Sequence, residues 1–160
     1  MIVLLMGVAG SGKTTVGQLL SRELGWAFAD ADDFHPAANV EKMRRGIPLT
    51  DEDRAPWLDA LRQLLVGWIS EEKNGVLACS ALKQSYRDAL AVGPEVKIVY
   101  LKGSPALLRE RVVSRHGHYM KAGMLESQFR ALEEPKDAIT VDVSASAEKV
   151  AAEVRKRLGL

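Results

Sequence analysis

Short apolar runs alternate along the chain with segments in which apolar residues recur every three or four positions. The apolar runs lie at 2–6, 27–29, 76–79, 96–101 and 139–143. Helical patterns begin near residues 13, 50, 104 and 146. This alternation is typical of parallel strands joined by crossover helices. We therefore expect an α/β fold with a five-stranded parallel sheet flanked by helices.

Several expected helix ends carry capping residues. Gly25 follows the first helical pattern, where a left-handed glycine is favoured. Thr50 and Asp53 have the spacing of a capping box for the second helix, and Pro56 suits a first helical turn. Ser146 precedes the last pattern and is a favoured N-cap residue.

Two stretches interrupt the alternation, one at 32–50 and one at 115–135. Ligands of open α/β sheets bind at the carboxyl ends of the strands, where such inserts would close over them. We expect one domain, 1–160, with a substrate-binding insert at about 32–72 and a lid at about 115–135.

Composition limits the classes of function. A chain of 160 residues fits one domain with a substantial core. Its 22 Lys and Arg balance 21 Asp and Glu, which argues against nucleic acid or an acidic membrane as a partner. The single cysteine, Cys79, cannot form an internal disulfide and is expected in the core, and the first apolar run is too short for a signal peptide or membrane span. We expect a cytoplasmic enzyme.

A phosphate-binding loop of pattern G-x-x-x-x-G-K-[ST] follows the first apolar run. It consists of Gly7, Val8, Ala9, Gly10, Ser11, Gly12, Lys13 and Thr14, with Thr15 directly after it. Glycines let successive N–H groups face an anion, and the next helix directs its positive dipole end there. Lys13 would follow the β- and γ-phosphates of ATP, and Thr14 would ligate Mg²⁺. The flanking strand and helix disfavour the alternative, an ordinary glycine-rich turn.

Carboxylates follow the second apolar run. Alternation along an extended chain would point Asp30 and Asp32 the same way. Asp30 would then hold Mg²⁺ through a water, and Asp32 would accept the proton of a substrate hydroxyl as it attacks the γ-phosphate. A solvated turn with helix-capping aspartates is the alternative.

Cations for an anionic acceptor lie in two segments. Lys83 and Arg87 are four residues apart and would share one face of a helix beginning near Ala81. Arg54 and Arg44 flank the first insert. Solvated surface charge is the alternative for all of them.

Further positions have competing interpretations. His35 would hydrogen-bond a substrate oxygen or serve as a structural residue of the turn. Of Arg111 and Arg115, one would stack on the nucleotide base and the other would neutralise charge on the transferring phosphoryl group, although an exposed helix C-terminus also favours arginine. His116 and His118 have no Cys or Glu partner at ligand spacing, so we do not expect zinc.

Longer motifs resemble the bacterial-type gluconate kinases, in the shikimate kinase and nucleoside-monophosphate kinase branch of phosphate-loop proteins. Beyond the phosphate loop, the matching strings include Asp30-x-Asp32-x-x-His35-Pro36, Gly46-x-Pro48-Leu49-x-Asp51-x-Asp53-Arg54-x-Pro56-Trp57-Leu58, Cys79-Ser80-Ala81-Leu82-Lys83-x-x-Tyr86-Arg87-Asp88, Gly117-His118-x-x-Lys121 and Leu125-x-x-Gln128-Phe129. The family commonly has Gly at the position of Ala31 and often has Ser at the position of Ala9.

The resemblance implies ATP-dependent phosphorylation of D-gluconate at its 6-hydroxyl, on a sheet of order 2-3-1-4-5, by a homodimer. Asp30 and Asp32 would serve the metal and the hydroxyl, in an order that analogy leaves open. The sugar-acid site would contain Asp32, His35, Arg54, Lys83 and Arg87. Lys13, Asp32 and Arg115 would be catalytic, and Arg111 and Arg115 would face the nucleotide.

Two other functions compete with this interpretation. A kinase of shikimate or of a nucleoside monophosphate would share the fold and the loop, but the longer motifs disfavour it. A nucleotide-switch module is a different class of protein. The chain has no Asn-Lys-x-Asp string, and the runs at 76–79 and 96–101 do not end in the acidic residue that binds Mg²⁺ in such modules.

Overall fold

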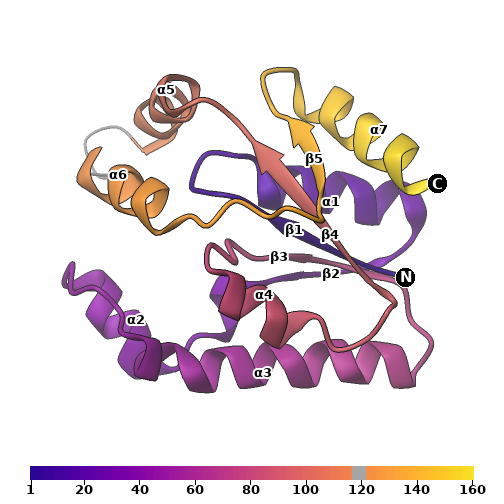
Figure 1. The fold of residues 1–160 in the computed structure, drawn as a ribbon, viewed down its shortest axis with the longest axis horizontal. Coiled ribbons are helices and arrows are strands. Elements are labelled where there is room, and N and C mark those ends of the chain that lie inside the picture. The colour runs from indigo at the N-terminus through magenta and orange to yellow at the C-terminus, as the bar shows by residue number, and fades with distance from the viewer. Residues whose placement is uncertain (117–121) are drawn as a thin grey trace.

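The computed structural model describes residues 1–160 except 117–121, with the side chains of 115, 116 and 122 also outside the description. Its parallel strands form one sheet in the order β2-β3-β1-β4-β5, which confirms the predicted 2-3-1-4-5 order (Figure 1). The strands are β1 (Ile2–Met6), β2 (Ala27–Asp30), β3 (Gly75–Ala78), β4 (Val96–Lys102) and β5 (Ile139–Asp142).

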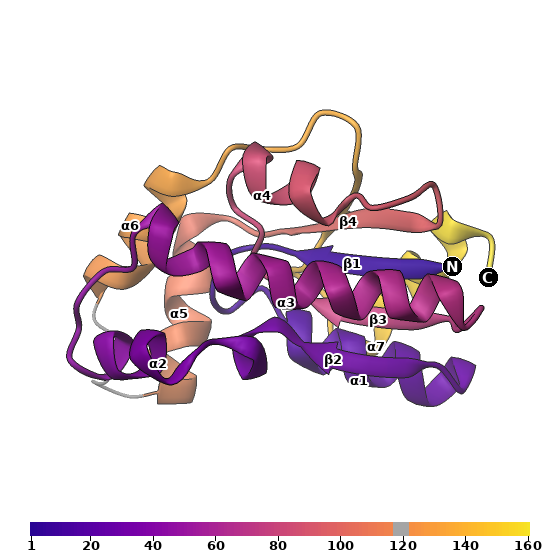
Figure 2. The same ribbon diagram turned by 90° about the horizontal axis from the view of Figure 1, so that it is seen from below.

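Helices cover both faces of this sheet. One face carries α1 (Lys13–Leu24), α5 (Pro105–His116) and α7 (Ala147–Leu158), and the other carries α3 (Asp51–Ser70) and α4 (Gln84–Leu90). Figure 2 shows α3 running along the sheet with α4 beside it. The carboxyl-end side carries the 3₁₀ helix η1 (Ala31–Phe34), α2 (Ala37–Arg44) and α6 (Ala122–Ala131). Within the described residues, no helix is both long enough and apolar enough to cross a membrane.

The central strand β1 is buried on both faces. Val3 and Leu5 belong to the apolar cluster under α1 and α7, whereas Ile2, Leu4 and Met6 belong to the cluster under α3 and α4. None of these side chains has exposed surface. Because a strand covered by helices on both faces needs apolar residues at every position, it forms a continuous apolar run in the sequence.

The start of α3 confirms the predicted capping box. The Thr50 hydroxyl accepts the Asp53 N–H at 3.1 Å, and the Asp53 carboxylate accepts the Thr50 N–H at 2.9 Å. The placement of Pro56 in the first turn is wrong, because the helix begins at Asp51 and Pro56 lies inside it. Proline there leaves the carbonyl of Glu52 without its intrahelical N–H donor, and Glu52 is exposed to water.

Candidate active site

The phosphate loop joins β1 to α1, and glycines determine its path. Gly10 and Gly12 have φ angles of 81° and 91°, in the left-handed region. A Cβ atom on Gly10 would lie 2.9 Å from Cγ2 of Val112, because α5 packs against the loop. Both the backbone conformation and the close packing therefore require glycine at this position.

The interior of this loop fits an anion. The Ser11 hydroxyl is buried and has no hydrogen-bond partner among the described residues. Lys13 Nζ donates to the carbonyl oxygens of Gly7 at 2.9 Å and Val8 at 3.1 Å. Burial lowers the pKa of Lys13, although the charge of Asp32 acts in the opposite direction. An orphaned hydroxyl and a half-buried ammonium are groups that a bound triphosphate would engage.

A pocket of about 610 Å³ adjoins the loop, a volume in the usual range for small-molecule sites. Its lining includes Gly10, Ser11, Gly12, Thr15, Leu107, Arg111, Val143 and Ala147. Arg111 donates to the carbonyl of Ala145 at 3.5 Å. The Cβ atom of Arg111 would lie 3.8 Å from a Cβ on Gly10, so the structure brings this predicted nucleotide residue beside the loop. Arg115 belongs to α5, but its side chain lies outside the described residues, and its role stays a prediction.

Asp30 ends β2 and connects the phosphate loop to the following turn. Its carboxylate accepts the Thr14 hydroxyl at 2.8 Å and the backbone N–H of Asp32 at 2.9 Å. The expectation that an extended chain aligns Asp30 with Asp32 is wrong, because the chain turns into η1 directly after Asp30. The Asp30 side chain caps this turn and so fixes the position of Asp32.

Asp32 lies among groups of both charges. Burial, followed by the negative charge of Asp30, raises the pKa of Asp32, while Lys13 and His35 act in the opposite direction. A carboxyl group whose pKa is raised takes up a proton more readily than one with the ordinary pKa of aspartate. The electrostatics therefore suit a proton acceptor beside the phosphate loop.

His35 is held by α3. Its ring stacks on Trp57 with the centroids 4.6 Å apart and the planes 8° from parallel. Trp57 Nε1 donates to the carbonyl of Ala31 at 2.7 Å, and Asn39 Nδ2 lies 3.3 Å from Nδ1 of His35. Burial lowers the pKa of His35, with Asp32 opposing and Arg54 reinforcing that shift. Trp57 is itself buried and thus orders the turn that carries the carboxylates.

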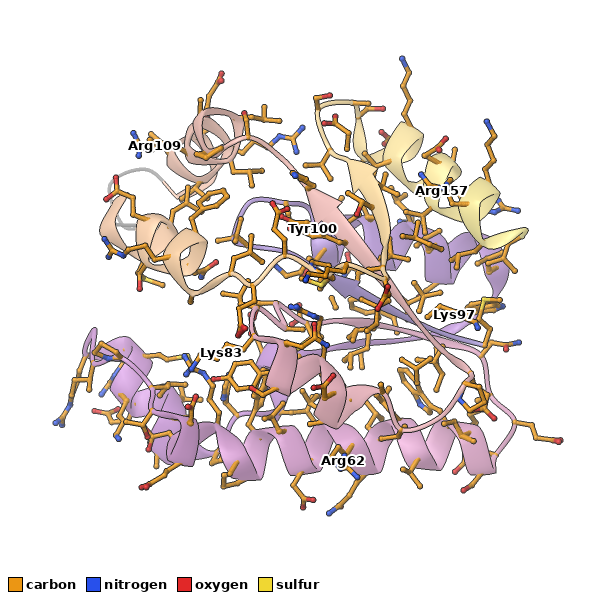
Figure 3. The ribbon with its side chains drawn as sticks, viewed as in Figure 1. Arg62, Lys83, Lys97, Tyr100, Arg109 and Arg157 are labelled. Carbon is orange, nitrogen blue, oxygen red and sulfur yellow. The ribbon has the colours of Figure 1, made fainter. Side chains whose placement is uncertain are left out.

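Four residues form what we call the cationic cluster, in which Arg54, Lys83 and Tyr86 surround the carboxylate of Asp51. Asp51 Oδ1 accepts from the Tyr86 hydroxyl at 2.6 Å and from Lys83 Nζ at 3.0 Å, and Arg54 Nη1 lies 3.9 Å away. Arg54 also donates to the Tyr86 hydroxyl at 3.1 Å. Hydrogen bonds from Tyr86 and Lys83 lower the pKa of Asp51. The structure therefore brings Arg54 and Lys83 together. Figure 3 shows Lys83 near the start of α3.

Known proteins are similar to this chain in sequence and in fold. The shikimate kinase family model matches residues 9–158. A probable gluconokinase of Mus musculus is 41% identical over 178 residues, covering 98% of this chain and 97% of the relative. The thermosensitive gluconokinase of Escherichia coli (strain K12) is 40% identical over 158 residues, covering 96% and 84%. The crystal structure of a gluconokinase from Sinorhizobium meliloti 1021 matches with a TM-score of 0.84 at 36% identity, covering 98% and 94%.

The chain belongs to the gluconokinase family.

One gluconokinase motif, at 79–88, contains a buried arginine that connects two loops through hydrogen bonds to their backbone carbonyls. Arg87 is buried and donates to two loop carbonyls, that of Ala81 at 2.8 Å among them, and to the carbonyl of Glu133 at 2.6 Å. The predicted helix start at Ala81 is wrong, because Ala81 is left-handed and α4 begins at Gln84. Lys83 and Arg87 therefore do not share a helix face. Contact between Arg87 and a sugar acid stays a prediction.

Other residues singled out in the sequence have simpler surroundings. Arg44 pairs with Glu41 and is highly exposed, as a solvated charge would be. Cys79 is buried, and burial raises the pKa of its thiol to about 12, as suits a core residue. His118 and the side chain of His116 lie outside the described residues.

Sequence reasoning missed two members of the cationic cluster, Asp51 and Tyr86. Both stand in the strings that resemble gluconokinases, so the motif itself was the available signal. An acid was not expected beside the cations that are predicted to bind an anionic substrate. Its presence follows from folding, which brings the first turn of α3 against the first turn of α4.

Proposed function

We propose that this chain is a gluconokinase that transfers the γ-phosphoryl group of ATP to the 6-hydroxyl of D-gluconate. One observation carries the proposal: the Asp30 carboxylate accepts a hydrogen bond from the Thr14 hydroxyl at 2.8 Å, so the acidic turn lies beside the phosphate loop. Had the carboxylates pointed away from that loop, no acceptor hydroxyl could lie between the two.

Asp32 and Lys13 supply the chemistry in this proposal. The acceptor oxygen forms a bond to Pγ as the bond between Pγ and the ADP oxygen breaks, and the hydroxyl proton passes to Asp32. Lys13 stabilises the charge that develops on the phosphoryl oxygens. Thr14 and Asp30 would hold Mg²⁺, which would neutralise part of the triphosphate charge.

The acceptor side of the proposed site continues from Asp32 toward the cationic cluster. The charges of both Asp32 and Arg54 act on the pKa of His35, which supports a site that runs from the proton acceptor to the cations. Arg54 and Lys83 would bind the carboxylate of gluconate, and the Tyr86 hydroxyl would add a donor. Asp51 balances one of the two positive charges, so the cluster has a net charge suited to a monocarboxylate.

The resemblance extends the proposal beyond the chemistry. The insert at about 32–72 would bind the sugar acid and the segment at about 115–135 would close over ATP. The protein would act in the cytoplasm as a homodimer, with neither nucleic acid nor membrane as a partner. Light scattering after size-exclusion chromatography tests the dimer, because a dimer has twice the mass of the 17.5 kDa chain.

A coupled assay of ADP release tests the proposed function. Gluconate, shikimate and AMP are offered in turn with ATP and Mg²⁺, and the product is identified by phosphorus NMR. We expect turnover with gluconate and little with the other two acceptors. Turnover with shikimate or AMP and none with gluconate would overturn the assignment, and ATP hydrolysis that is independent of every acceptor would favour a switch module. Lys13→Ala serves as the inactive control.

A further inference from the structure

Helix α6 reaches the phosphate loop through one side chain. Gln128 Oε1 accepts the backbone N–H of Ala9 at 2.7 Å. Ala9 lies within the loop whose N–H groups face the anion site, and Gln128 belongs to a motif that the mechanism above does not use. The contact joins residues 119 positions apart in the sequence.

Packing holds α6 in place and so fixes the position of the Gln128 side chain relative to the phosphate loop. Leu125 is buried in the cluster under α1 and α7, and Phe129 packs against the same cluster. Arg109 on α5, labelled in Figure 3, pairs with Glu126 on α6 at 2.8 Å. Residues three positions apart lie on the same helix face, so the burial of Leu125 directs Gln128 inward as well.

The segment that follows α6 contacts the loop between β3 and α4, which we call the acceptor loop. The backbone N–H of Glu133 donates to the carbonyl of Leu82 at 2.8 Å, and the Glu133 carboxylate accepts the N–H of Gln84 at 3.3 Å. The backbone carbonyl of Glu133 accepts a hydrogen bond from Arg87 at 2.6 Å. Figures 1 and 2 show this segment beside the loop between β3 and α4. Lys83 stands within that loop, so residues 128–133 contact both sides of the site.

We propose that Gln128 is a positioning residue: its carboxamide oxygen holds the Ala9 N–H so that the phosphate loop is preformed for ATP, and residues 128–133 couple this loop to the acceptor loop that carries Lys83. The inference rests on the proposed function, since ATP and gluconate are the ligands that would be coupled.

The chemistry of the contact favours an amide at position 128. A carboxylate would accept the same hydrogen bond but would place a negative charge beside the triphosphate. A methionine of similar length would fill the space without accepting the bond. Gln128→Glu therefore keeps the acceptor and adds charge, whereas Gln128→Met removes the acceptor and adds no charge.

Calorimetric titration with a non-hydrolysable ATP analogue and Mg²⁺, without gluconate, separates these effects. We expect Gln128→Met to weaken binding about threefold to tenfold, the usual value of one hydrogen bond. Gln128→Glu should weaken it more than about tenfold, because the added charge repels the phosphates at short range. Gln63 lies exposed on α3, and the matched controls Gln63→Met and Gln63→Glu should stay within about twofold of wild type.

Two further measurements report on how Gln128 positions the phosphate loop rather than on the overall stability of the protein. Amide exchange at Ala9, measured without ligand, should be faster in Gln128→Met than in wild type, because the N–H loses its acceptor. The ATP analogue should tighten gluconate binding in wild type, and this coupling factor should fall toward one in Gln128→Met. Linkage requires that gluconate tighten analogue binding by the same factor.

The outcomes are distinguishable. Wild-type analogue affinity in folded Gln128→Met, or slow Ala9 exchange there, overturns the positioning role. Equal affinities of Gln128→Met and Gln128→Glu overturn the argument for a neutral amide. Gln128→Asn, which shortens the reach, replaces the methionine variant if thermal melts show that the latter is unfolded. A wild-type protein that binds the analogue but does not phosphorylate gluconate overturns the proposed function and leaves the Ala9 measurements valid.

Discussion

Replacing Trp57 with phenylalanine tests how the turn that carries Asp30 and Asp32 is held. The Trp57 indole donates to the carbonyl of Ala31 at 2.7 Å, and its ring stacks on His35. Ala31 stands between Asp30 and Asp32 and is 1% exposed. Phenylalanine keeps an aromatic ring but has no donor, so the Ala31 carbonyl would lose this partner in a site closed to water.

The expected magnitude follows from that geometry. Leaving a buried acceptor without its partner costs about 1–3 kcal/mol, so we expect Trp57→Phe to lower the free energy of unfolding by about 2 kcal/mol. For a chain of 160 residues such a loss lowers the melting temperature by roughly 4–8 °C. The catalytic efficiency with gluconate should fall at least severalfold, because Asp32 and His35 lose a common support.

Trp68→Phe is the matched control. Trp68 lies on the same helix and is also buried, and no hydrogen bond of its indole occurs among the described residues. Urea unfolding followed by circular dichroism measures stability, and the coupled assay measures rate. We expect Trp68→Phe to lose packing energy against Gly75 with an unchanged rate. Equal rates for both variants, with equal stability losses, would refute the role of the Trp57 donor.

Other predictions concern charged groups. Lys13→Ala should remove most turnover without lowering the free energy of unfolding in urea, because burial disfavours its charge. Asp32→Asn should also remove most turnover. In wild type the rate should fall as the pH falls through the raised Asp32 pKa, above 3.8, because the protonated acid cannot accept a proton. Asp53 has its pKa lowered to about 2, chiefly by the hydrogen bond from Lys42, so it stabilises the fold above pH 3.8. The stability difference between wild type and Asp53→Asn should therefore shrink as the pH falls from 3.8 toward 2, as acid titration of the urea midpoint can measure. Lys83→Met should raise KM for gluconate about tenfold and leave KM for ATP unchanged, which steady-state kinetics can check.

The sequence by itself determined the elements that depend on neighbouring residues. The apolar run of β1, the period of α1 and the left-handed Gly25 at its end are all local patterns, and the structure reproduces them. The phosphate loop is equally local, since its glycines and Lys13 lie within one turn between a strand and a helix. The longer gluconokinase strings then indicated the acceptor side without showing how its residues meet.

Only the tertiary structure decided which polar groups share a site. Asp51 meets Tyr86, Gln128 meets Ala9, and Arg87 binds the Glu133 carbonyl, each across a long stretch of sequence. Side-chain donors and acceptors have many possible partners in the unfolded chain, and their pairing depends on which loops the packed helices and strands bring together. Hydrophobic periodicity places the elements, whereas these directional contacts form only after the elements have packed.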